Sequence, residues 1–233
     1  MTKKEILDAI HGKMIISCQA VEGEPLYVEE KSIMYLMARA AKQAGTPAIR
    51  TSSIRDVVAI KEETGLPVIG LVKIQYPGYE AYITPTMKEV DDLVAAGSDV
   101  VALDCTLRKR GDGTTINEFI AQIKEKYPDI ILMADISNYE EGINAWKCGV
   151  DIVGTTMSGY TAYTSKKDEP DYELMERLAK DTDIPVIGEG KIHYPDQAVK
   201  ALQTGAWAIV VGGAITRPLE IAQRFQNAIE ASK

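Results

Sequence analysis

Short apolar runs alternate with longer amphipathic segments along most of this chain. Four of the amphipathic segments end at a glycine, at positions 45, 97, 149 and 205, so the repeat is 52, 52 and 56 residues long. Glycine just past a helix is the expected C-cap. Each glycine precedes a short apolar run, at Ala48-Ile49, Val100–Leu103, Ile152-Val153 and Ala208–Val211. The repeat therefore predicts a helix followed by a strand, four times over.

A second set of apolar runs, each led by a proline, falls between the first, at Pro67, Pro128 and Pro185. Proline suits the first residue of a strand. With Met14–Cys18 as the first strand, eight strands are expected. Their apolar runs are nearly continuous, which is typical of parallel strands covered on both faces.

Two strand-and-helix units repeated four times predict a single (β/α)8 TIM barrel, with residues 1–233 as one domain. Residues 2–11 predict a short leading helix at the barrel floor, and residues 31–44 a second helix. An open doubly wound sheet is the alternative, but the chain lacks its Gly-x-Gly-x-x-Gly signature.

The composition limits the kinds of ligand and partner that this protein is expected to bind. The 233 residues are 45% hydrophobic and 26% charged, as in an ordinary globular protein. A net charge of −8 disfavours nucleic-acid and anionic-membrane binding. No apolar run approaches the roughly 18 residues of a membrane-spanning helix. Three cysteines, at 18, 105 and 148, lack metal-ligand spacing and predict reduced thiols in a cytoplasmic protein. With only two histidines, no catalytic metal is expected.

The stretch Pro185–Pro218 predicts a phosphate-binding site. Its two strands end in Glu189-Gly190 and Gly212-Gly213, and Arg217 follows. Glycines allow backbone N–H groups to approach a ligand closely, and the last two strand-to-helix loops of a (β/α)8 barrel often hold a phosphate. Arg217 could add a bidentate contact. The simpler interpretation is that both glycine pairs only turn the chain.

Polar residues stand where the predicted strands end, which is where active sites of this fold lie. In chain order they are Gln19, Arg50, Lys73, Asp104, Asp135, Thr155, Thr156, Glu189, Gly212 and Gly213. Lys73 follows an apolar strand, so partial desolvation or a cationic neighbour such as Arg50 would lower its pKa and let it accept a proton. The alternative is a structural lysine paired with Asp104 or Asp135.

The acidic candidates have two interpretations each. Of Asp135 and Glu189, one could orient Lys73 while the other serves as a second acid or base. Alternatively, both could form salt bridges that close the barrel rim. Asp104 is expected either to bind a ligand hydroxyl or to brace the fold.

The neutral and basic candidates also have a functional and a structural interpretation each. Gln19 and Arg50 carry donors for a polar substrate but are as readily structural. His193 follows the glycine of the seventh strand, so it is expected to lie near the site but to be exposed. The loop 154–164 is long enough to fold over a ligand, or is an ordinary polar loop. This loop carries hydroxyl groups that could bind a sugar, on Thr155, Thr156 and Tyr160.

An ordered set of motifs resembles the bacterial N-acetylmannosamine-6-phosphate 2-epimerase family of sialic-acid degradation. The resemblance extends over residues 13–230. The motifs, in order, are Ser17-Cys-Gln-Ala, Ala48-Ile-Arg, Pro67-Val-Ile-Gly…Lys73, Ala102-Leu-Asp-Cys-Thr, Met133-Ala-Asp-Ile, Gly154-Thr-Thr…Gly159-Tyr-Thr, Glu189-Gly and Val211-Gly-Gly-Ala-Ile-Thr-Arg-Pro. The glycine pair alone would suit many phosphate-binding barrels, whereas the full set is much more specific.

The resemblance implies cofactor-independent interconversion of N-acetylmannosamine 6-phosphate and N-acetylglucosamine 6-phosphate, with a phosphorylated amino sugar as ligand. Lys73 would remove the C2 proton of the open-chain sugar, and either Lys73 or Glu189 would return one to the other face. Asp135 would assist ring opening and Arg50 would stabilise the oxyanion, with Gln19 beside the sugar. The implied phosphate ligands are Gly190, Gly212, Gly213 and Arg217. A homodimer is expected, because barrels of this kind commonly form one.

Two other functions are compatible with these residues. A strand-end lysine in a phosphate-binding barrel could form a Schiff base, as in a lyase or aldolase acting on a phosphorylated carbonyl substrate. A non-catalytic sugar-phosphate binder is the third possibility. The combination of a lysine with two carboxylates argues against simple binding, which needs no proton-transfer group.

Overall fold

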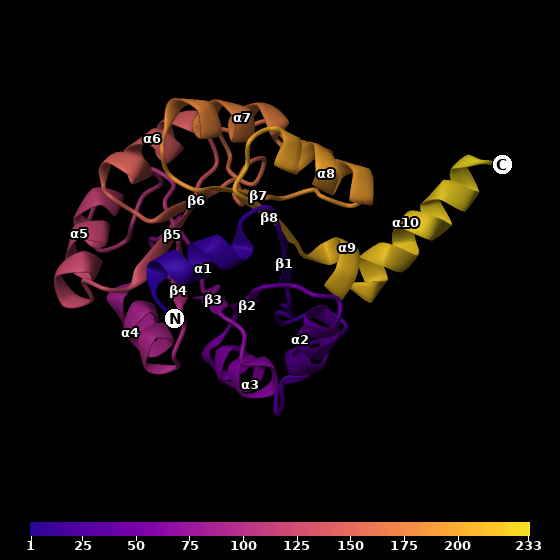
Figure 1. The fold of residues 1–233 in the computed structure, drawn as a ribbon, viewed down its shortest axis with the longest axis horizontal. Coiled ribbons are helices and arrows are strands. Elements are labelled where there is room, and N and C mark those ends of the chain that lie inside the picture. Colours follow the sequence, from indigo (N-terminus) through magenta and orange to yellow (C-terminus); the bar gives the residue numbers. More distant parts are fainter.

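The computed structural model describes residues 1–233 and contains a closed barrel of eight parallel strands in the order β1 to β8, with β8 paired to β1 (Figure 1). This confirms the predicted TIM barrel. The strands are β1 (Met14–Ser17), β2 (Ile49–Ser52), β3 (Val68–Leu71), β4 (Val100–Asp104), β5 (Ile131–Asp135), β6 (Ile152–Gly154), β7 (Val186–Glu189) and β8 (Ala208–Val211).

Helices surround the barrel, and local capping chemistry sets where many of them begin. The Thr115 hydroxyl accepts a hydrogen bond from the Glu118 N–H at 3.2 Å and starts α5, while the left-handed Gly65 ends α3. The surrounding helices are α2 (Met34–Gln43), α3 (Ile54–Thr64), α4 (Met87–Ala95), α5 (Ile116–Lys126), α6 (Tyr139–Lys147), α7 (Tyr172–Asp181) and α8 (Pro195–Gln203). The helix predicted over 31–44 begins later, at Met34, whose N–H donates to the Ser32 hydroxyl at 3.1 Å.

The leading helix α1 (Lys3–Ile10) closes the floor of the barrel, as the sequence predicted. Ile6 and Ile10 are buried in one cluster with barrel residues such as Ile15. The indole of Trp207, the residue before β8, donates to the Leu7 carbonyl at 2.9 Å. The N-terminal end of the barrel is therefore a packed plug, and ligands can enter only from the other end.

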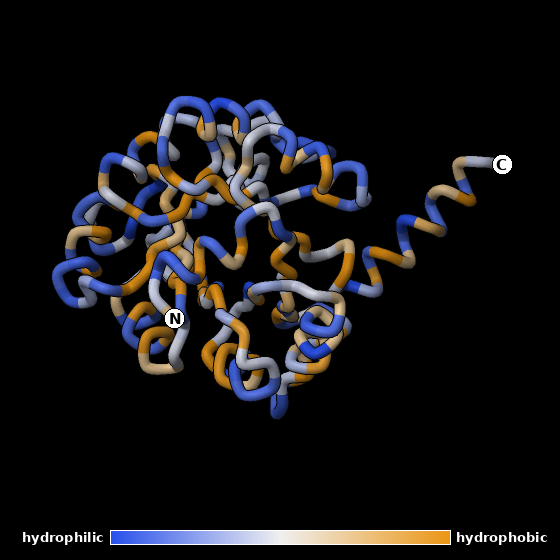
Figure 2. Tube along the Cα trace, in the orientation of Figure 1, coloured by the Kyte–Doolittle hydropathy of each residue, from blue (hydrophilic) through white to orange (hydrophobic).

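The hydrophobic core has two layers, which explains the continuous apolar runs. All five residues of β4 and all five of β5 are buried, because alternate side chains point into the barrel and toward the helices. Figure 2 shows the strands as hydrophobic segments inside a largely hydrophilic ring of helices. None of the helices combines the length and the apolar character needed to cross a bilayer.

The C-terminal segment departs from the regular arrangement. After β8, a four-residue helix α9 (Gly213–Thr216) leads into α10 (Pro218–Ala231), which projects away from the barrel (Figure 1). No residue of α10 is buried. Hydrophobic positions recur along this projecting helix (Figure 2). The apolar residues exposed on it are Leu219, Phe225 and Ile229.

Candidate active site

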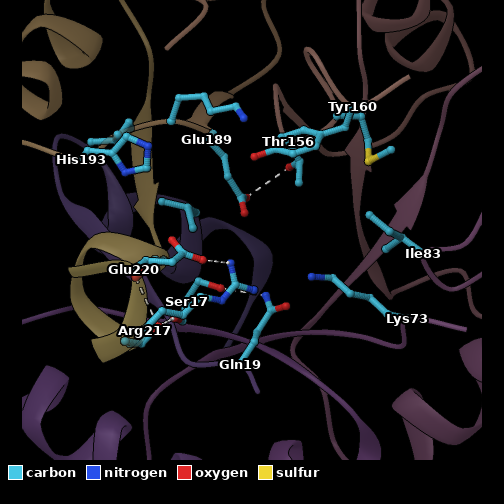
Figure 3. A pocket seen from close by; sticks show the side chains of 18 of the residues that line it. Ser17, Gln19, Lys73, Ile83, Thr156, Tyr160, Glu189, His193, Arg217 and Glu220 are labelled. Atoms are coloured by element: carbon cyan, nitrogen blue, oxygen red, sulfur yellow. Dashed lines mark hydrogen bonds and ion pairs between the residues drawn. The ribbon is translucent and has the colours of Figure 1, made fainter. Parts of the chain in front are cut away.

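A cavity of about 280 Å³ opens at the C-terminal ends of the strands (Figure 3). Nine of the residues that the sequence singled out line it: Gln19, Lys73, Thr156, Tyr160, Glu189, Gly190, Gly212, Gly213 and Arg217. Four others, Arg50, Asp104, Asp135 and Thr155, do not line it and are buried. The lysine, one carboxylate and both glycine pairs thus share one cavity, with further polar groups behind its wall.

Lys73 enters the cavity from the loop that follows β3. Its backbone forms an antiparallel bridge with Ile83, so residues 74–82 fold back as a loop over the barrel rim. The side chain is exposed to the cavity and points toward its centre (Figure 3). Desolvation by the surrounding protein, followed by the positive charges of Arg50 and Arg217, lowers the pKa of Lys73 below its ordinary value of 10.5. Lys73 is therefore suited to take up a proton.

A buried ionic network lies behind the cavity wall. The guanidinium of Arg50 is 1% exposed and lies 2.6 Å from the Asp135 carboxylate, which is fully buried. A Glu189 carboxylate oxygen lies 3.4 Å from Nε of Arg50. One cation is thus shared between two carboxylates at the ends of β5 and β7. The salt bridges that the sequence offered as an alternative for Asp135 and Glu189 are present.

Thr156 connects the same two carboxylates. Its Oγ1 lies 2.6 Å from Oδ1 of Asp135 and 3.1 Å from Oε2 of Glu189. Burial raises the pKa of Glu189 against the opposing effect of Arg50, with a further rise from the Asp135 charge. The neighbouring Thr155 holds the Glu189 backbone, donating to its carbonyl at 2.9 Å and accepting from its N–H at 3.0 Å.

Asp104 lies behind the wall in a separate network. It forms an ion pair with Arg108 and accepts hydrogen bonds from the N–H groups of Tyr82, at 3.2 Å, and Thr106, at 3.1 Å. These contacts are the internal bracing that the sequence offered as one interpretation of Asp104. Direct contact with a ligand would require this network to open, so substrate binding by Asp104 stays a prediction that its position does not favour.

Gln19 has an unused acceptor at the cavity. Its Nε2 donates to the Ser17 hydroxyl at 2.7 Å, and the side chain is buried. Its Oε1 has no hydrogen-bond partner. A buried acceptor without a partner is costly unless a ligand satisfies it. Gln19 can therefore receive a hydrogen bond from a ligand hydroxyl or N–H group.

The glycine pairs and Arg217 form the other end of the cavity. Gly190 has φ of 102°, which only glycine adopts readily, and Gly212-Gly213 open α9. Arg217 lies between two carboxylates: its Nε is 2.9 Å from Glu24 and its Nη1 is 3.2 Å from Glu220. The cation that the sequence assigned to a phosphate is thus already paired in the protein.

Several residues that line the cavity were missed by the sequence analysis or placed wrongly. Glu220, in the first turn of α10, lines it and was not predicted. Lys191 lines it with φ of 61°, and its Nζ lies 4.3 Å from the centroid of the Tyr160 ring. His193, expected near the site but exposed, does line the cavity and is half-buried. Burial lowers its pKa, as does the charge of Arg224 on α10. The available signal for Lys191 and His193 was their place just after Gly190.

Known proteins are similar to this chain in both sequence and structure. A family model described as "Putative N-acetylmannosamine-6-phosphate epimerase" matches residues 34–231. A protein of Caldanaerobacter subterraneus subsp. tengcongensis named "Putative N-acetylmannosamine-6-phosphate 2-epimerase" is 53% identical over 226 residues, covering 97% of this chain and 94% of its own. The solved structure of the N-acetylmannosamine-6-phosphate 2-epimerase from Clostridium perfringens is 48% identical, covers 96% of each chain and has a TM-score of 0.90.

A more distant structure shares the fold alone. The thiamine phosphate pyrophosphorylase of Pyrococcus furiosus is 19% identical, covers 94% of this chain and 93% of its own, and has a TM-score of 0.61. Similar barrels can carry different reactions, so this likeness says nothing about the chemistry of the present cavity.

Proposed function

This chain belongs to the N-acetylmannosamine-6-phosphate epimerase family, and on that basis we propose that its cavity interconverts N-acetylmannosamine 6-phosphate and N-acetylglucosamine 6-phosphate by proton transfer at C2. One observation carries the assignment of residues. Lys73 and Glu189 point into one cavity, whose other end is formed by Arg217 and two glycine pairs (Figure 3). A phosphorylated sugar can thus bind by its phosphate and present C2 to both groups.

The first step is removal of the C2 proton. In the open-chain sugar, C2 lies beside the C1 aldehyde, so loss of its proton leaves an enolate. Lys73 takes this proton in its neutral form, which its lowered pKa makes more available. Gln19 accepts a hydrogen bond from the sugar through its unpartnered Oε1. Arg50 is buried and already paired, so it acts on the enolate charge at a distance rather than by contact.

The second step is return of a proton to the opposite face of C2. β3, which precedes Lys73, and β7, which ends in Glu189, are four strands apart in a closed barrel of eight. Groups from opposite sides of the barrel reach opposite faces of a ligand held between them. Burial raises the pKa of Glu189 and favours its protonated form, as a proton donor requires. This arrangement supports two bases rather than one.

Ring opening precedes both steps: the bond between C1 and the ring oxygen breaks, the C1 hydroxyl gives its proton to an acceptor, and the ring oxygen takes one up. Asp135 does not line the cavity, but Thr156 does, with its hydroxyl 2.6 Å from Asp135. We assign Asp135 the role of a positioning residue that acts through Thr156. No step uses a cofactor, because the base, the acid and the hydrogen-bond donors are all groups of this protein.

The test is proton NMR of N-acetylmannosamine 6-phosphate with the protein in D₂O. The expected result is N-acetylglucosamine 6-phosphate with deuterium at C2 from the first turnover, because a second base delivers a solvent-derived proton. Substantial retention of the original proton would point to Lys73 acting alone. Absence of any conversion would overturn the proposal. A covalent adduct on Lys73 after borohydride treatment with substrate would instead indicate a Schiff-base lyase.

We further infer that the protein is a homodimer, and α10 supports this. The helix leaves the barrel instead of covering β8, and its exposed apolar residues include Phe225, 70% exposed, and Ile229, 54% exposed. The barrel wall beside it exposes Leu36 on α2 and Val199 on α8. A second copy of this chain would bury both sets of residues at once. Exposed apolar stripes of this kind mark interfaces.

Sedimentation analysis tests the dimer. The wild-type protein is expected to sediment as a dimer and Phe225→Asp as a monomer, because an aspartate at the centre of a buried interface is costly. Gln226→Asp changes the charge at the next position and serves as the control. A wild-type monomer at micromolar concentration would contradict the inference.

A further inference from the structure

The carboxylate of Glu220 occupies the end of the cavity where a ligand phosphate would lie. Its Oε1 is 3.2 Å from Nη1 of Arg217. Its Oε2 lies directly over Gly213, so close that a Cβ at that position would clash with it. Figure 3 shows Glu220 pointing into the cavity beside Arg217. The absence of a side chain at Gly213 is what allows the carboxylate to sit at the start of α9.

The charges at this end cannot all stay in place when a phosphate binds. Arg217 contributes one positive charge, and Glu24 and Glu220 each contribute a negative charge within 3.2 Å of it. A phosphate dianion on Arg217 and the glycine N–H groups would add two more negative charges beside these carboxylates. Like charges at such distances repel strongly in a partly desolvated cavity. Displacement of one carboxylate would relieve this repulsion and free Arg217 for the phosphate.

Glu220 is the carboxylate that is free to move. The second oxygen of Glu24 accepts a hydrogen bond from the Val21 N–H at 2.9 Å, which holds Glu24 in its loop. Glu220 bonds only to Arg217, and its side chain is 39% exposed. It lies in the first turn of α10, and moving its side chain requires no movement of the helix. A change of rotamer would place its carboxylate in solvent.

We propose that Glu220 determines the affinity for phosphorylated ligands, because its carboxylate holds the place of the phosphate on Arg217 and must be displaced when substrate binds. This rests on the proposed function, which places the phosphate at Arg217 and the glycine pairs. Glu220 satisfies Arg217 in the free protein. It also weakens binding of the phosphorylated product, which leaves as the carboxylate returns.

The test is the inhibition constant of inorganic phosphate for wild type, Glu220→Gln and Glu230→Gln. Glutamine keeps the size of the side chain but removes the charge that competes for Arg217. We expect Glu220→Gln to bind phosphate roughly five- to tenfold more tightly and to lower KM for the sugar phosphate in parallel. Glu230 lies on the same helix, with its side chain 64% exposed and paired with Lys233. Glu230→Gln loses the same charge, and its inhibition constant for phosphate and its KM should equal those of the wild type.

Three results would overturn the inference. Unchanged phosphate inhibition in Glu220→Gln would show that the carboxylate does not compete, and weaker inhibition would show that it holds Arg217 in position for the phosphate. Either result leaves the epimerase assignment intact if the wild type converts substrate in D₂O. A wild type that converts substrate but is not inhibited by phosphate up to high millimolar concentration would contradict the phosphate site itself, and Glu220 displacement with it.

Discussion

Oγ1 of Thr156 lies 3.1 Å from a carboxylate oxygen of Glu189 and, on its other side, 2.6 Å from Asp135. A threonine hydroxyl has one proton, so it can donate fully to only one carboxylate at a time. The hydrogen bond that Glu189 receives from Thr156 is therefore coupled to the one that Asp135 receives from the same hydroxyl. In the sequence Thr156 was a candidate sugar ligand, and the structure adds this second role.

Thr156→Val should alter the pH profile as well as the rate. The hydrogen bond from Thr156 stabilises the charged form of Glu189, so its loss raises the pKa of Glu189 further. We expect kcat/KM to fall roughly 5- to 100-fold, with the limb that reports Glu189 moved to higher pH. Thr156→Ser keeps the hydroxyl and should restore both. A valine variant with an unshifted profile would contradict the coupling.

Lys73→Met should remove the reaction while leaving the fold intact. The side chain is exposed to the cavity, so replacement disturbs no packed core. We expect kcat to fall by about 10²- to 10⁴-fold, the usual loss on removal of a general base. Exchange of the C2 proton with D₂O should stop, and the circular dichroism spectrum should not change. Lys88→Met replaces an exposed lysine on α4 and is the control. Retained C2 exchange in Lys73→Met would assign the base elsewhere.

The dependence of the rate on pH follows from the same lysine. Only neutral Lys73 accepts a proton, and its pKa lies below 10.5 because the cavity desolvates it and Arg50 is near. In the two-base mechanism kcat/KM requires neutral Lys73 and protonated Glu189 together, so it should rise and then fall with pH whichever of the two pKa values is the lower. Measuring kcat/KM against pH gives a bell-shaped curve. A rate that rises steadily to pH 10.5 would argue against Glu189 as the acid.

Arg50→Met should destabilise the protein by about 3–5 kcal/mol, because it leaves two buried carboxylates without their cation. In the variant the pKa of Glu189, already raised by burial, rises further because the opposing charge of Arg50 is gone. Stability is then retained at low pH, where Glu189 is protonated, and lost as the pH rises. The loss should therefore be larger at pH 8 than at pH 5 in urea unfolding. Arg39→Met breaks an exposed pair with Glu63 and should cost below about 1 kcal/mol. Equal losses at both pH values would contradict this interpretation.

Ile10→Ala should weaken the fold without affecting catalysis. Ile10 is 1% exposed in the plug at the barrel floor, at the opposite end from the cavity. Truncating a buried isoleucine to alanine typically costs about 2–5 kcal/mol, and each 1 kcal/mol lowers the Tm of a protein of this size by about 2–4 °C. The value of kcat at a temperature well below the Tm should equal that of wild type. Val58→Ala, at an exposed position of α3, should change the Tm little.

The sequence alone determined the barrel, its floor helix and the family, because these depend on local patterns. Continuous apolar runs between glycine-capped helices specify buried parallel strands, and the ordered motifs specify the family. It also identified Lys73, Glu189 and the glycine pairs as neighbours, since the ends of parallel strands converge in this fold.

Only the tertiary structure decided which strand-end residues reach the cavity. Arg50, Asp104 and Asp135 follow the same pattern as Lys73, but they lie behind the wall because partners on other strands or loops hold them there. Glu220 reaches the cavity from a helix outside the strand repeat, so no strand-end pattern points to it. The sequence pattern shows which residues stand at the ends of strands. Whether such a polar side chain reaches the cavity depends on the charged partners that the fold brings beside it from other parts of the chain.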